Sequence, residues 1–423
     1  MSLIVQKYGG SSVSDAEALK RVAARIVETK NAGNDVVVAV SAMGDTTDDL
    51  IDLAHAVCKN PPEREMDILL TAGERISMAL LTIAIRAQGV NARGFTGPMA
   101  GVVTTGHHGR ARIIGVSPDR IEKAIADGEI VIVAGFQGLS HDSQDITTLG
   151  RGGTDTTAVA LAAALHADVC EIYTDVDGVF TADPRIVPRA RKLDRVVYEE
   201  MLELAASGAK VLMPRCVEYA RRYNVPIHVR SAFSDKDGTW IVGESDQGET
   251  MEEPIIAGVA HDHSQAKITV VGIPDVPGTA ARLFETVAAA EVNIDMIVQN
   301  VSAHDTGVTD ISFTLPATDG AKARAAIEAK KAEIGYEELR YDDTIGKLSL
   351  VGAGMRTHSG VSAKLFGALR DAGINIEMIS TSDIRISVIT RAEQLDTAVR
   401  AIHTAFDLDA DQDESVVYGG SGR

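Results

Sequence analysis

Two alternating patterns of hydrophobic residues run through the first half of the chain. An extended run, Leu3 to Lys7, is followed by two glycines, by apolar residues at helical spacing, and by a second extended run, Val36 to Val40. The apolar residues at helical spacing are Leu19, Val22, Ala23, Ile26 and Val27. Ser14 and Glu17 have the S-x-x-E spacing of a capping box, which predicts that this helix begins near Ser14. The segment is a strand–helix–strand unit.

The same alternation continues beyond this unit. Its later members are a helical stretch from Glu63 to Gln88, a strand from Ile130 to Ala134, a helix from Asp155 to His166 and a strand from Val169 to Thr174. Strands that alternate regularly with helices form a mainly parallel sheet covered by helices on both faces. We therefore expect an α/β domain over residues 1–244.

The pattern changes after residue 244. The stretch Glu244 to Pro254 is acidic and turn-rich, so we place a linker at 245–264. Beyond it the sequence repeats at an offset of about 80 residues, and Val292 to Ile297 is echoed by Ile374 to Ile379. Each copy reads strand, turn, helix, strand, and a further alternating strand follows. We expect two small βαββ-type modules, at 265–345 and 346–423.

Charge and cysteine content narrow the functional class. The 41 basic and 60 acidic residues give a net charge of −19, which argues against nucleic-acid or membrane-surface partners. Three cysteines without C-x-x-C spacing fit reduced thiols in a cytosol, and no window holds 18 uninterrupted apolar residues. We expect a soluble cytoplasmic protein. The pairs His107-His108 and His261-x-His263 lack a third ligand, so we expect solvated loop histidines and no resident metal site.

Two glycine clusters stand between predicted strands and helices. In Lys7 to Ser12 the glycines let backbone amides approach a phosphate, and the following helix start adds a favourable field. Gly150 to Thr157 combines exposed backbone, a guanidinium and hydroxyls, which suits a carboxylate or a phosphate. Tight turns remain an alternative for both, with Thr154 as a helix N-cap in the second.

Three further turn segments carry polar groups near strand ends or helix bends. They are Ser41 to Thr47, Thr71 to Arg75 and Tyr173 to Arg185. The acidic trio in the last segment is similar to a calcium loop, but the glutamate expected at the twelfth position is missing, so we do not expect calcium there.

The chain resembles the aspartate kinases, a branch of the amino-acid kinase family. The resemblance rests on four segments in the family's order: Lys7 to Ser12, Thr71 to Arg75, Gly150 to Asp155 and Tyr173 to Val179. The repeated modules resemble ACT domains, so the resemblance covers essentially the whole chain. It is nearest to the lysine- and threonine-regulated form. Two departures are Thr154, where many members have serine, and two extra residues before Ser359-Gly360 in the second module.

The resemblance implies an activity and its partners. The expected reaction is phosphoryl transfer from ATP, with Mg²⁺, to the side-chain carboxylate of L-aspartate, giving 4-phospho-L-aspartate for lysine, threonine and methionine synthesis. Lysine and threonine are the expected effectors. We expect a homo-oligomer, or an assembly with a regulatory subunit translated from an internal start near Met251. Two alternatives stay open: a kinase of glutamate or another carboxylate, and a non-enzymatic amino-acid sensor on a degenerate kinase domain.

The same resemblance assigns site residues. Lys7, Arg151 and Asp155 are the expected catalytic residues, and Asp155 would orient Lys7 or the transferring group unless it caps a helix. The nucleotide site would comprise Lys7, Tyr8, Gly9, Gly10, Ser11, Ser41, Thr174, Asp175, Phe180, Asp183, Arg185 and Lys210. The aspartate site would comprise Thr47, Glu74, Arg151, Gly152, Gly153 and Thr154. Glu74 would face the substrate ammonium, and the guanidinium fork of Arg151 would pair with a substrate carboxylate.

Effector amino acids are expected where strand ends meet a helix start in the two modules. In the first module the matching residues are Asp275, Gly278, Thr279, Ala280, Asn293, Ile294 and Gln299. In the second they are Asn375, Ile376, Thr381 and Ser382. For the apolar members of both sets, core packing is an equally good interpretation.

Overall fold

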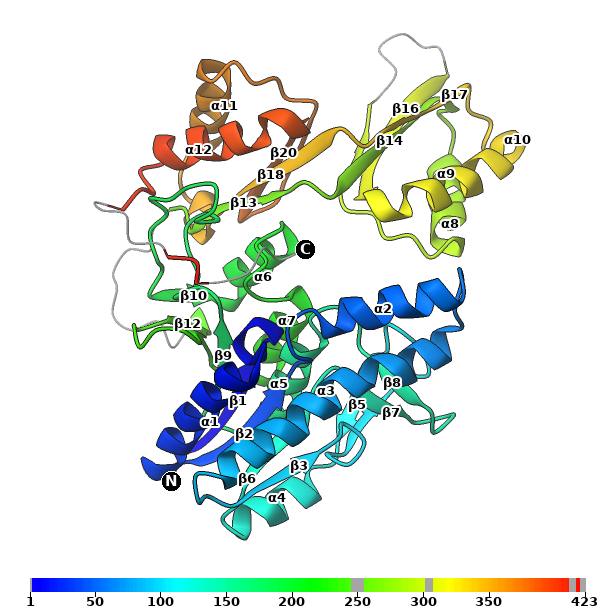
Figure 1. The fold of residues 1–423 in the computed structure, drawn as a ribbon. Helices are drawn as coiled ribbons and strands as arrows, with labels where there is room; N and C mark the ends of the chain where they lie inside the picture. Colours follow the sequence, from blue (N-terminus) through cyan, green and yellow to red (C-terminus); the bar gives the residue numbers. More distant parts are fainter. Residues whose placement is uncertain (1, 245–254, 301–306, 411–415, 419–423) are drawn as a thin grey trace.

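The computed structural model describes residues 2–244, 255–300, 307–410 and 416–418. Figure 1 shows a larger N-terminal domain and, beyond it, two smaller modules side by side. The larger domain has an eight-stranded sheet in the spatial order β10 (Arg195–Val197), β12 (Thr239–Val242), β11 (Ile227–Ser231), β9 (Val169–Thr174), β1 (Leu3–Tyr8), β2 (Asp35–Val40), β6 (Ile130–Ala134) and β3 (Ala92–Phe95). Neighbouring strands are parallel except β11 and β12. The predicted mainly parallel sheet is confirmed.

Helices cover both faces of this sheet. One face carries α1 (Ala16–Asn31) and α3 (Glu63–Arg86). The other carries α4 (Asp119–Ala126), α5 (Gly153–Ala164), α6 (Tyr198–Ala206) and α7 (Pro214–Tyr223). Successive residues of β2 alternate between the two cores, with Val38 packed toward α1 and α3 and Val37 toward the opposite face. Such apolar strands, buried on both sides, are typical of a covered parallel sheet.

Helix α1 begins one residue later than the capping-box pattern predicts. Its N-cap is Asp15, whose carboxylate accepts a hydrogen bond from the Ala18 backbone N–H at 2.8 Å. The Ser14 hydroxyl donates to the same carboxylate at 3.1 Å. An Asp is as good an N-cap as Ser, and its charge also interacts favourably with the helix N-terminus.

A smaller sheet flanks α3. Its order is β5 (Ile113–Val116), β4 (Val102–Thr104), β7 (Gln137–Ser140) and β8 (Ile146–Thr148). Helix α2 (Thr46–Val57) and strand β8 both lie against α3. By length and composition α3 could cross a membrane, but it packs on α1, β3 and β6 and buries two acidic side chains, Asp67 and Glu74. These contacts make α3 part of the domain core.

The C-terminal third contains two four-stranded antiparallel sheets with helices. The first sheet is β15 (Ile297–Gln299), β16 (Val308–Pro316), β14 (Gln265–Pro274) and β17 (Glu338–Asp342), with α8 (Thr279–Ala289), α9 (Gly320–Ala329) and α10 (Lys331–Ile334). The second is β13 (Gly258–Asp262), β18 (Ile345–Val351), β20 (Arg385–Arg391) and β19 (Met378–Thr381), with α11 (Val361–Asp371) and α12 (Leu395–Ala405). The two predicted βαββ-type modules are therefore present.

One strand differs from the expected domain limits. β13 lies inside the stretch 245–264 that we interpreted as a linker, yet it pairs with β18 and so belongs to the second sheet. Val259 stands opposite Leu350, and Ala260 opposite Ser349. A five-residue strand carries too little periodicity to be recognised. Its partner also lies beyond the whole first module, so no local pattern reveals the pairing.

The second module shares a hydrophobic core with the larger domain. The segment 176–190, between β9 and β10, contributes Phe180 and Val187 to a cluster that also contains Val259 and Leu348. These residues are buried, and the contact brings β13 against the larger domain. The segment is the one that the sequence assigns to the nucleotide.

Candidate active site

The predicted phosphate-binding segment lies where β1 leads into a 3-10 turn, Gly10–Val13. The Nζ of Lys7 forms an ion pair of 2.6 Å with Oδ1 of Asp155, in the first turn of α5. A Cβ on Gly10 would lie 2.9 Å from the carbonyl oxygens of Ala42 and Gly44, so this close backbone approach requires glycine. The lysine and the exposed loop backbone thus lie at the edge where the parallel strands β1 and β2 end.

The N-terminus of α5 has no side-chain cap. Its N-cap is Gly152, which has φ +69°, and a Cβ there would lie 1.9 Å from Cγ of Met213. Neither Thr154 nor Asp155 is therefore the N-cap, so helix capping does not explain either residue. The Gly153 N–H donates to the Gly150 carbonyl at 3.0 Å, and no side chain caps the remaining first-turn N–H groups. An uncapped helix start favours anions.

A cavity of about 610 Å³ brings most of the predicted residues together. The predicted residues that line it are Lys7, Gly9, Gly10, Ser41, Thr47, Glu74, Arg151, Gly152, Gly153, Thr154 and Asp155. They come from β1, α2, α3, α5 and the turns that follow β1, β2 and β8. The side chain of Arg151 is exposed and has no ion-pair partner among the residues that the structure describes. It is free to pair with a ligand carboxylate.

Glu74 is a buried carboxylate with a spare oxygen. Its Oε1 accepts from the Ala42 backbone N–H at 3.3 Å, while Oε2 is buried without a hydrogen-bond partner among the described residues. Burial raises the pKa of Glu74 to about 7, against an ordinary 4.5, although the Ala42 hydrogen bond acts in the opposite direction. The adjacent Gly73 permits this packing, because a Cβ there would lie 2.7 Å from that of Ala42. A buried carboxylate oxygen without a hydrogen-bond partner on a cavity wall is placed to accept from a cationic ligand group.

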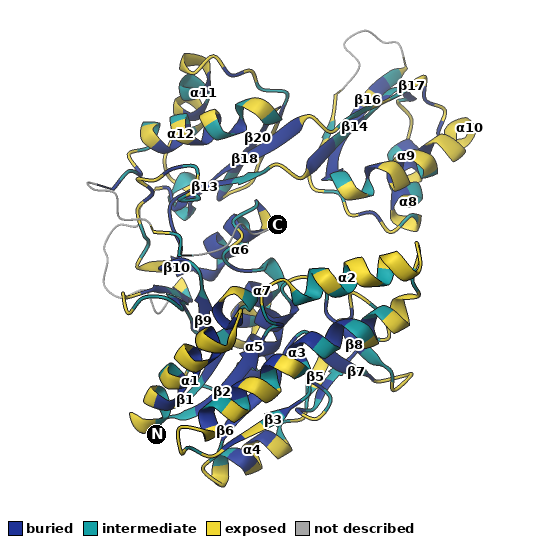
Figure 2. Ribbon diagram, viewed as in Figure 1, coloured by how far each residue is buried: buried dark blue, intermediate teal, exposed yellow. Residues whose placement is uncertain are grey.

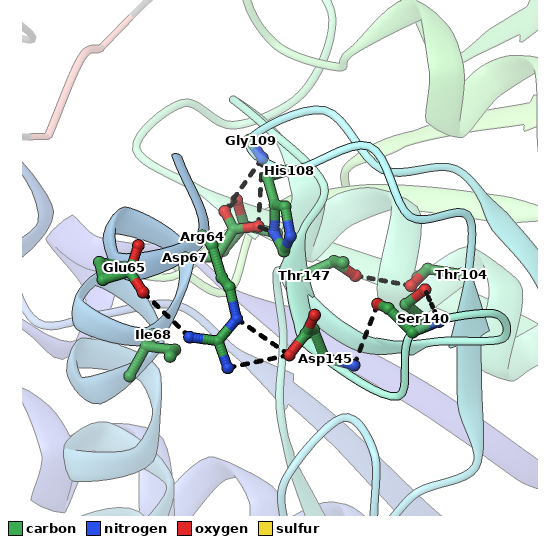
Figure 3. Close-up of polar contacts among 12 residues, drawn as sticks. Arg64, Glu65, Asp67, Ile68, Thr104, His108, Gly109, Ser140, Asp145 and Thr147 are labelled. Carbon is green, nitrogen blue, oxygen red and sulfur yellow. Dashed lines mark hydrogen bonds and ion pairs between the residues drawn. The ribbon is translucent and has the colours of Figure 1, made fainter. Parts of the chain in front are cut away.

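A second buried acid, Asp67, was not predicted from the sequence. It accepts from Gly109 N–H at 3.0 Å, and it lies 2.6 Å from Nδ1 of His108 (Figure 3). It also accepts from the Thr148 hydroxyl at 2.5 Å. Asp67, Gly109 and Thr148 all line the cavity. The sequence offered one signal, an acidic residue at a core position of an apolar helix. The His108 ring is thus hydrogen-bonded to Asp67 and largely covered, so the expectation of a solvated loop histidine was wrong for it.

A separate cavity of about 250 Å³ brings together the residues predicted for the nucleotide side. Thr174, Asp175, Phe180, Asp183, Arg185 and Lys210 all line it. A guanidinium nitrogen of Arg185 lies 3.2 Å from Oδ2 of Asp175, and the Thr174 hydroxyl donates to Oδ1 at 3.0 Å. The sequence missed one wall, which consists of Val259, Ala260 and His261 on β13. Burial lowers the pKa of His261, which favours the neutral imidazole.

Two predicted nucleotide residues lie outside both cavities. Tyr8 is fully buried, and its ring stacks on Tyr173 with centroids 4.6 Å apart. Its side chain therefore cannot contact a nucleotide, and only its backbone remains for that role. Ser11 is exposed on the turn after β1 and lines neither cavity. A sequence motif contains residues that hold the loop in place as well as residues that line the cavity, and spacing alone does not separate the two.

The predicted effector residues divide in the same way. Asp275, Gly278, Thr279, Ala280 and Gln299 line a cavity of about 330 Å³ at the start of α8. Asn293 and Ile294 do not line it, and Ile294 packs against the core of the first module.

In the second module, a cavity of about 450 Å³ lies at the start of α11. Asn375, Ile376, Thr381 and Ser382 do not line it. Ile376 packs against the cluster shared with the larger domain, and Thr381 is exposed at the end of β19. For Ile294 and Ile376, the structure shows the core-packing alternative.

Comparisons with known proteins fit this arrangement. The amino acid kinase family model matches residues 2–231, and an ACT domain model matches residues 268–330 and 348–406. The aspartokinase of Mycolicibacterium smegmatis is 65% identical over 423 residues, covering 100% of both chains. The chain belongs to the aspartokinase family. Family membership makes it a phosphotransferase, and it confirms the resemblance that the four sequence segments indicated.

Solved aspartokinases agree with this assignment. The aspartate kinase of Synechocystis, at 43% identity, covers 98% of this chain and 71% of its own, with a TM-score of 0.53. Escherichia coli aspartokinase III, in a T-state complex with lysine and aspartate, is 25% identical and has a TM-score of 0.70. That match covers 96% of this chain and 99% of the other. Both matches cover nearly the whole of this chain, so they include the larger domain and both modules.

Proposed function

We propose that the chain transfers the γ-phosphoryl group of ATP to the side-chain carboxylate of L-aspartate, giving 4-phospho-L-aspartate. The observation that carries this proposal is the 610 Å³ cavity, which holds a Lys7–Asp155 ion pair together with an unpaired arginine and the spare oxygen of Glu74. A ligand with one ammonium and two carboxylates matches these groups. The reaction would begin the synthesis of lysine, threonine and methionine in the cytoplasm.

The chemistry needs positioning more than proton transfer. An aspartate side chain has a reference pKa of about 3.9, so it is already a carboxylate nucleophile at neutral pH. The barrier comes from bringing this anion to a triphosphate. Lys7 and the loop amides of Gly9 and Gly10 would offset the phosphate charge, while Arg151 would hold the α-carboxylate in line. Asp155 would keep the Lys7 ammonium at the phosphates.

Mg²⁺ is proposed to enter with the nucleotide. Among the described residues no group of three or more His, Cys, Asp and Glu side chains is placed to hold a metal ion. This fits Mg²⁺, which keeps several waters and takes one or two carboxylates in addition to phosphate oxygens. Asp155, in the wall that also holds Lys7, is the carboxylate that would face it. When bound, the ion neutralises charge on the phosphates.

Lysine and threonine are proposed as effectors. The cavity at the start of α8 has the acid Asp275, the hydroxyl of Thr279 and the amide of Gln299 on its walls, which are groups that bind amino acids. E. coli aspartokinase III has been solved with lysine and aspartate. Each effector must bind one conformation better than another, and a typical coupling is about 1–3 kcal/mol.

A homo-oligomer is also proposed. The outer face of α3 exposes Ile76, at 52%, and Ile83, at 63%, and Figure 2 shows exposed residues along this helix. Neighbouring apolar side chains that stay exposed mark an interaction surface more often than they mark a free one. The alternative start at Met251, which would supply a separate regulatory subunit, lies outside the described residues.

The test is hydroxylamine trapping of the acyl phosphate. Purified protein is incubated with Mg-ATP and either L-aspartate or L-glutamate, with and without lysine plus threonine. We expect hydroxamate from aspartate only, suppressed by the effector pair. Trapping from glutamate at an equal rate would overturn the substrate assignment. Absence of trapping from folded protein that binds ATP would favour a non-enzymatic sensor.

A further inference from the structure

Thr181 lies in the nucleotide segment and is completely buried. Its hydroxyl lies 2.8 Å from Nε2 of His403, at the end of α12 in the second module, and accepts from the Arg191 backbone N–H at 3.0 Å. Its carbonyl oxygen accepts from Val259 N–H of β13 at 2.7 Å. One residue of the nucleotide segment is therefore held from two elements of the regulatory module.

The tautomer of His403 follows from its partners. Nδ1 lies 3.2 Å from a carboxylate oxygen of Asp409, which can only accept when ionised. Nδ1 thus carries the hydrogen, which leaves Nε2 as an acceptor. The Thr181 hydroxyl donates to Nε2 at 2.8 Å and also lies 3.3 Å from the Leu408 carbonyl, the longer of its two acceptor contacts. Burial lowers the pKa of His403, so the neutral ring persists at physiological pH. Thr181, His403 and Asp409 thus form a chain of two hydrogen bonds, in which Thr181 donates to His403 and His403 donates to Asp409.

Residues on both sides of Thr181 contact the nucleotide cavity. Phe180, Ala182 and Asp183 line it, and Val259 and its neighbours on β13 form the facing wall. The C-terminal segment is bound to the same region. Ala410 N–H donates to the Arg189 carbonyl at 2.7 Å, and Tyr418 N–H donates to the Asp175 carbonyl at 2.9 Å. Displacement of the module would therefore move the residues around the nucleotide.

We propose that His403, oriented by Asp409, is a positioning residue that holds the nucleotide segment in its binding conformation through Thr181. The second regulatory module thereby sets the affinity for the adenine nucleotide, while the aspartate end of the site stays unaffected. This inference rests on the proposed function only in taking the 250 Å³ cavity as the nucleotide site. If the buried hydrogen bond only held the two domains together, its loss would lower stability. It would not weaken nucleotide binding while leaving aspartate binding unchanged.

The test compares Thr181→Val with Thr181→Ser in the full chain. Valine keeps the shape of threonine and lacks the hydroxyl, whereas serine keeps the hydroxyl. ADP affinity is measured by isothermal titration calorimetry, and KM values for ATP and aspartate by initial rates. We expect Thr181→Val to weaken ADP binding and raise KM for ATP by about fivefold to tenfold, with KM for aspartate within about twofold. Thr181→Ser should stay near wild type.

A matched control is His263→Gln, because His263 pairs with Asp396 at 3.1 Å on the exposed surface of the same module. It should leave ADP affinity unchanged. If Thr181→Val does not fold, Asp409→Asn tests the same chain of hydrogen bonds from Asp409, its partly exposed end. We again expect weaker ADP binding and a higher KM for ATP, with KM for aspartate within about twofold.

Three outcomes would overturn the proposal: unchanged ADP affinity in a folded variant, an equal loss in Thr181→Ser, or a change confined to aspartate. The titration needs no aspartate. A chain that binds ADP in this way without phosphorylating aspartate would therefore refute the proposed function and leave the positioning role standing.

Discussion

The Nζ of Lys7 lies 2.6 Å from Oδ1 of Asp155, so an ion pair joins the end of β1 to the first turn of α5. Both side chains are largely buried. In the proposed reaction Lys7 contacts the phosphates, which requires a restricted set of rotamers, and the Asp155 carboxylate restricts them. The pair thereby connects the two glycine-rich segments that the sequence presents far apart.

Asp155→Asn is expected to lower kcat by about tenfold to a hundredfold, because misplacing a charge-stabilising group costs on that scale. KM for aspartate should change little, since Arg151 and Glu74 remain. Steady-state kinetics with the hydroxamate assay measures both. Asp35→Asn is the control, because it breaks a comparable Lys–Asp pair, Lys30–Asp35 at 2.9 Å, outside the cavities. An equal loss of kcat in both variants would remove the special role of Asp155.

The pKa of Glu74 predicts a pH dependence of catalysis. Burial raises this pKa to about 7, and only the ionised form attracts a substrate ammonium. We expect kcat/KM for aspartate to fall about tenfold per pH unit below pH 7 and to level off above it, since this ratio reports groups of the free enzyme. In Glu74→Gln, kcat/KM for aspartate should be lower at all pH values, and its fall below pH 7 should be absent. A step near pH 7 that persists in the variant would assign it to another group.

Glu74 also predicts a cost in stability. Between pH 4.5 and 7 the folded state holds a proton that the unfolded state releases, so stability falls as pH rises through this window. Raising a pKa from 4.5 to about 7 corresponds to about 3 kcal/mol. Glu74→Gln should therefore melt at a higher temperature than wild type at pH 8, with little difference at pH 4.5. Differential scanning calorimetry at the two pH values checks this, and equal melting temperatures at pH 8 would contradict it.

Local patterns predicted the sheet and the glycine loops well, because both signals are short. The alternation that marks β1, α1 and β2 lies within about forty residues, and the glycines near Lys7 and Arg151 reflect close approaches that only glycine permits. The structure places both loops on one cavity. Parallel strands bring their carboxyl ends to one edge, so even this meeting follows from the fold class.

The remaining features depend on distant contacts. β13 forms a strand because it pairs with β18. That pairing places His261 on the wall of the proposed nucleotide cavity. Asp67 becomes part of the site because the loop containing His108 folds over α3. Tyr8 illustrates the reverse case, since it stands in a binding motif while its side chain packs beneath the loop. Periodicity and motif spacing contain no information on such pairings.

Arg151 predicts a requirement for geometry as well as charge. Arg151→Lys keeps a cation in the cavity and loses the planar fork that matches a carboxylate. We expect KM for aspartate to rise at least tenfold, with KM for ATP within about twofold. Arg75→Lys serves as the control, because Arg75 lies on α3 outside the cavity lining. A rise in KM for ATP alone would place Arg151 at the phosphates.

Asp67 predicts a positioning role for the aspartate end of the site. Its carboxylate connects α3 to Gly109 and to Thr148, which precedes the Arg151 turn by three residues. Asp67→Asn keeps the size of the side chain but leaves an amide N–H where an acceptor is needed, so the loop and the turn should separate from α3. We expect KM for aspartate to rise about tenfold while ADP affinity, measured by calorimetry, stays constant.

The neighbouring Asp145 provides the matched control for this prediction. It pairs with Arg64 of α3, the helix that also carries Asp67, at 3.0 Å (Figure 3), and both partners are more exposed than Asp67. Asp145→Asn should leave KM for aspartate unchanged, because surface ion pairs contribute little and this one does not line the cavity. If both variants raised KM equally, the effect would come from loosening α3 as a whole. If neither did, the hydrogen bonds of Asp67 would serve stability alone, and calorimetric unfolding of Asp67→Asn would then show the loss.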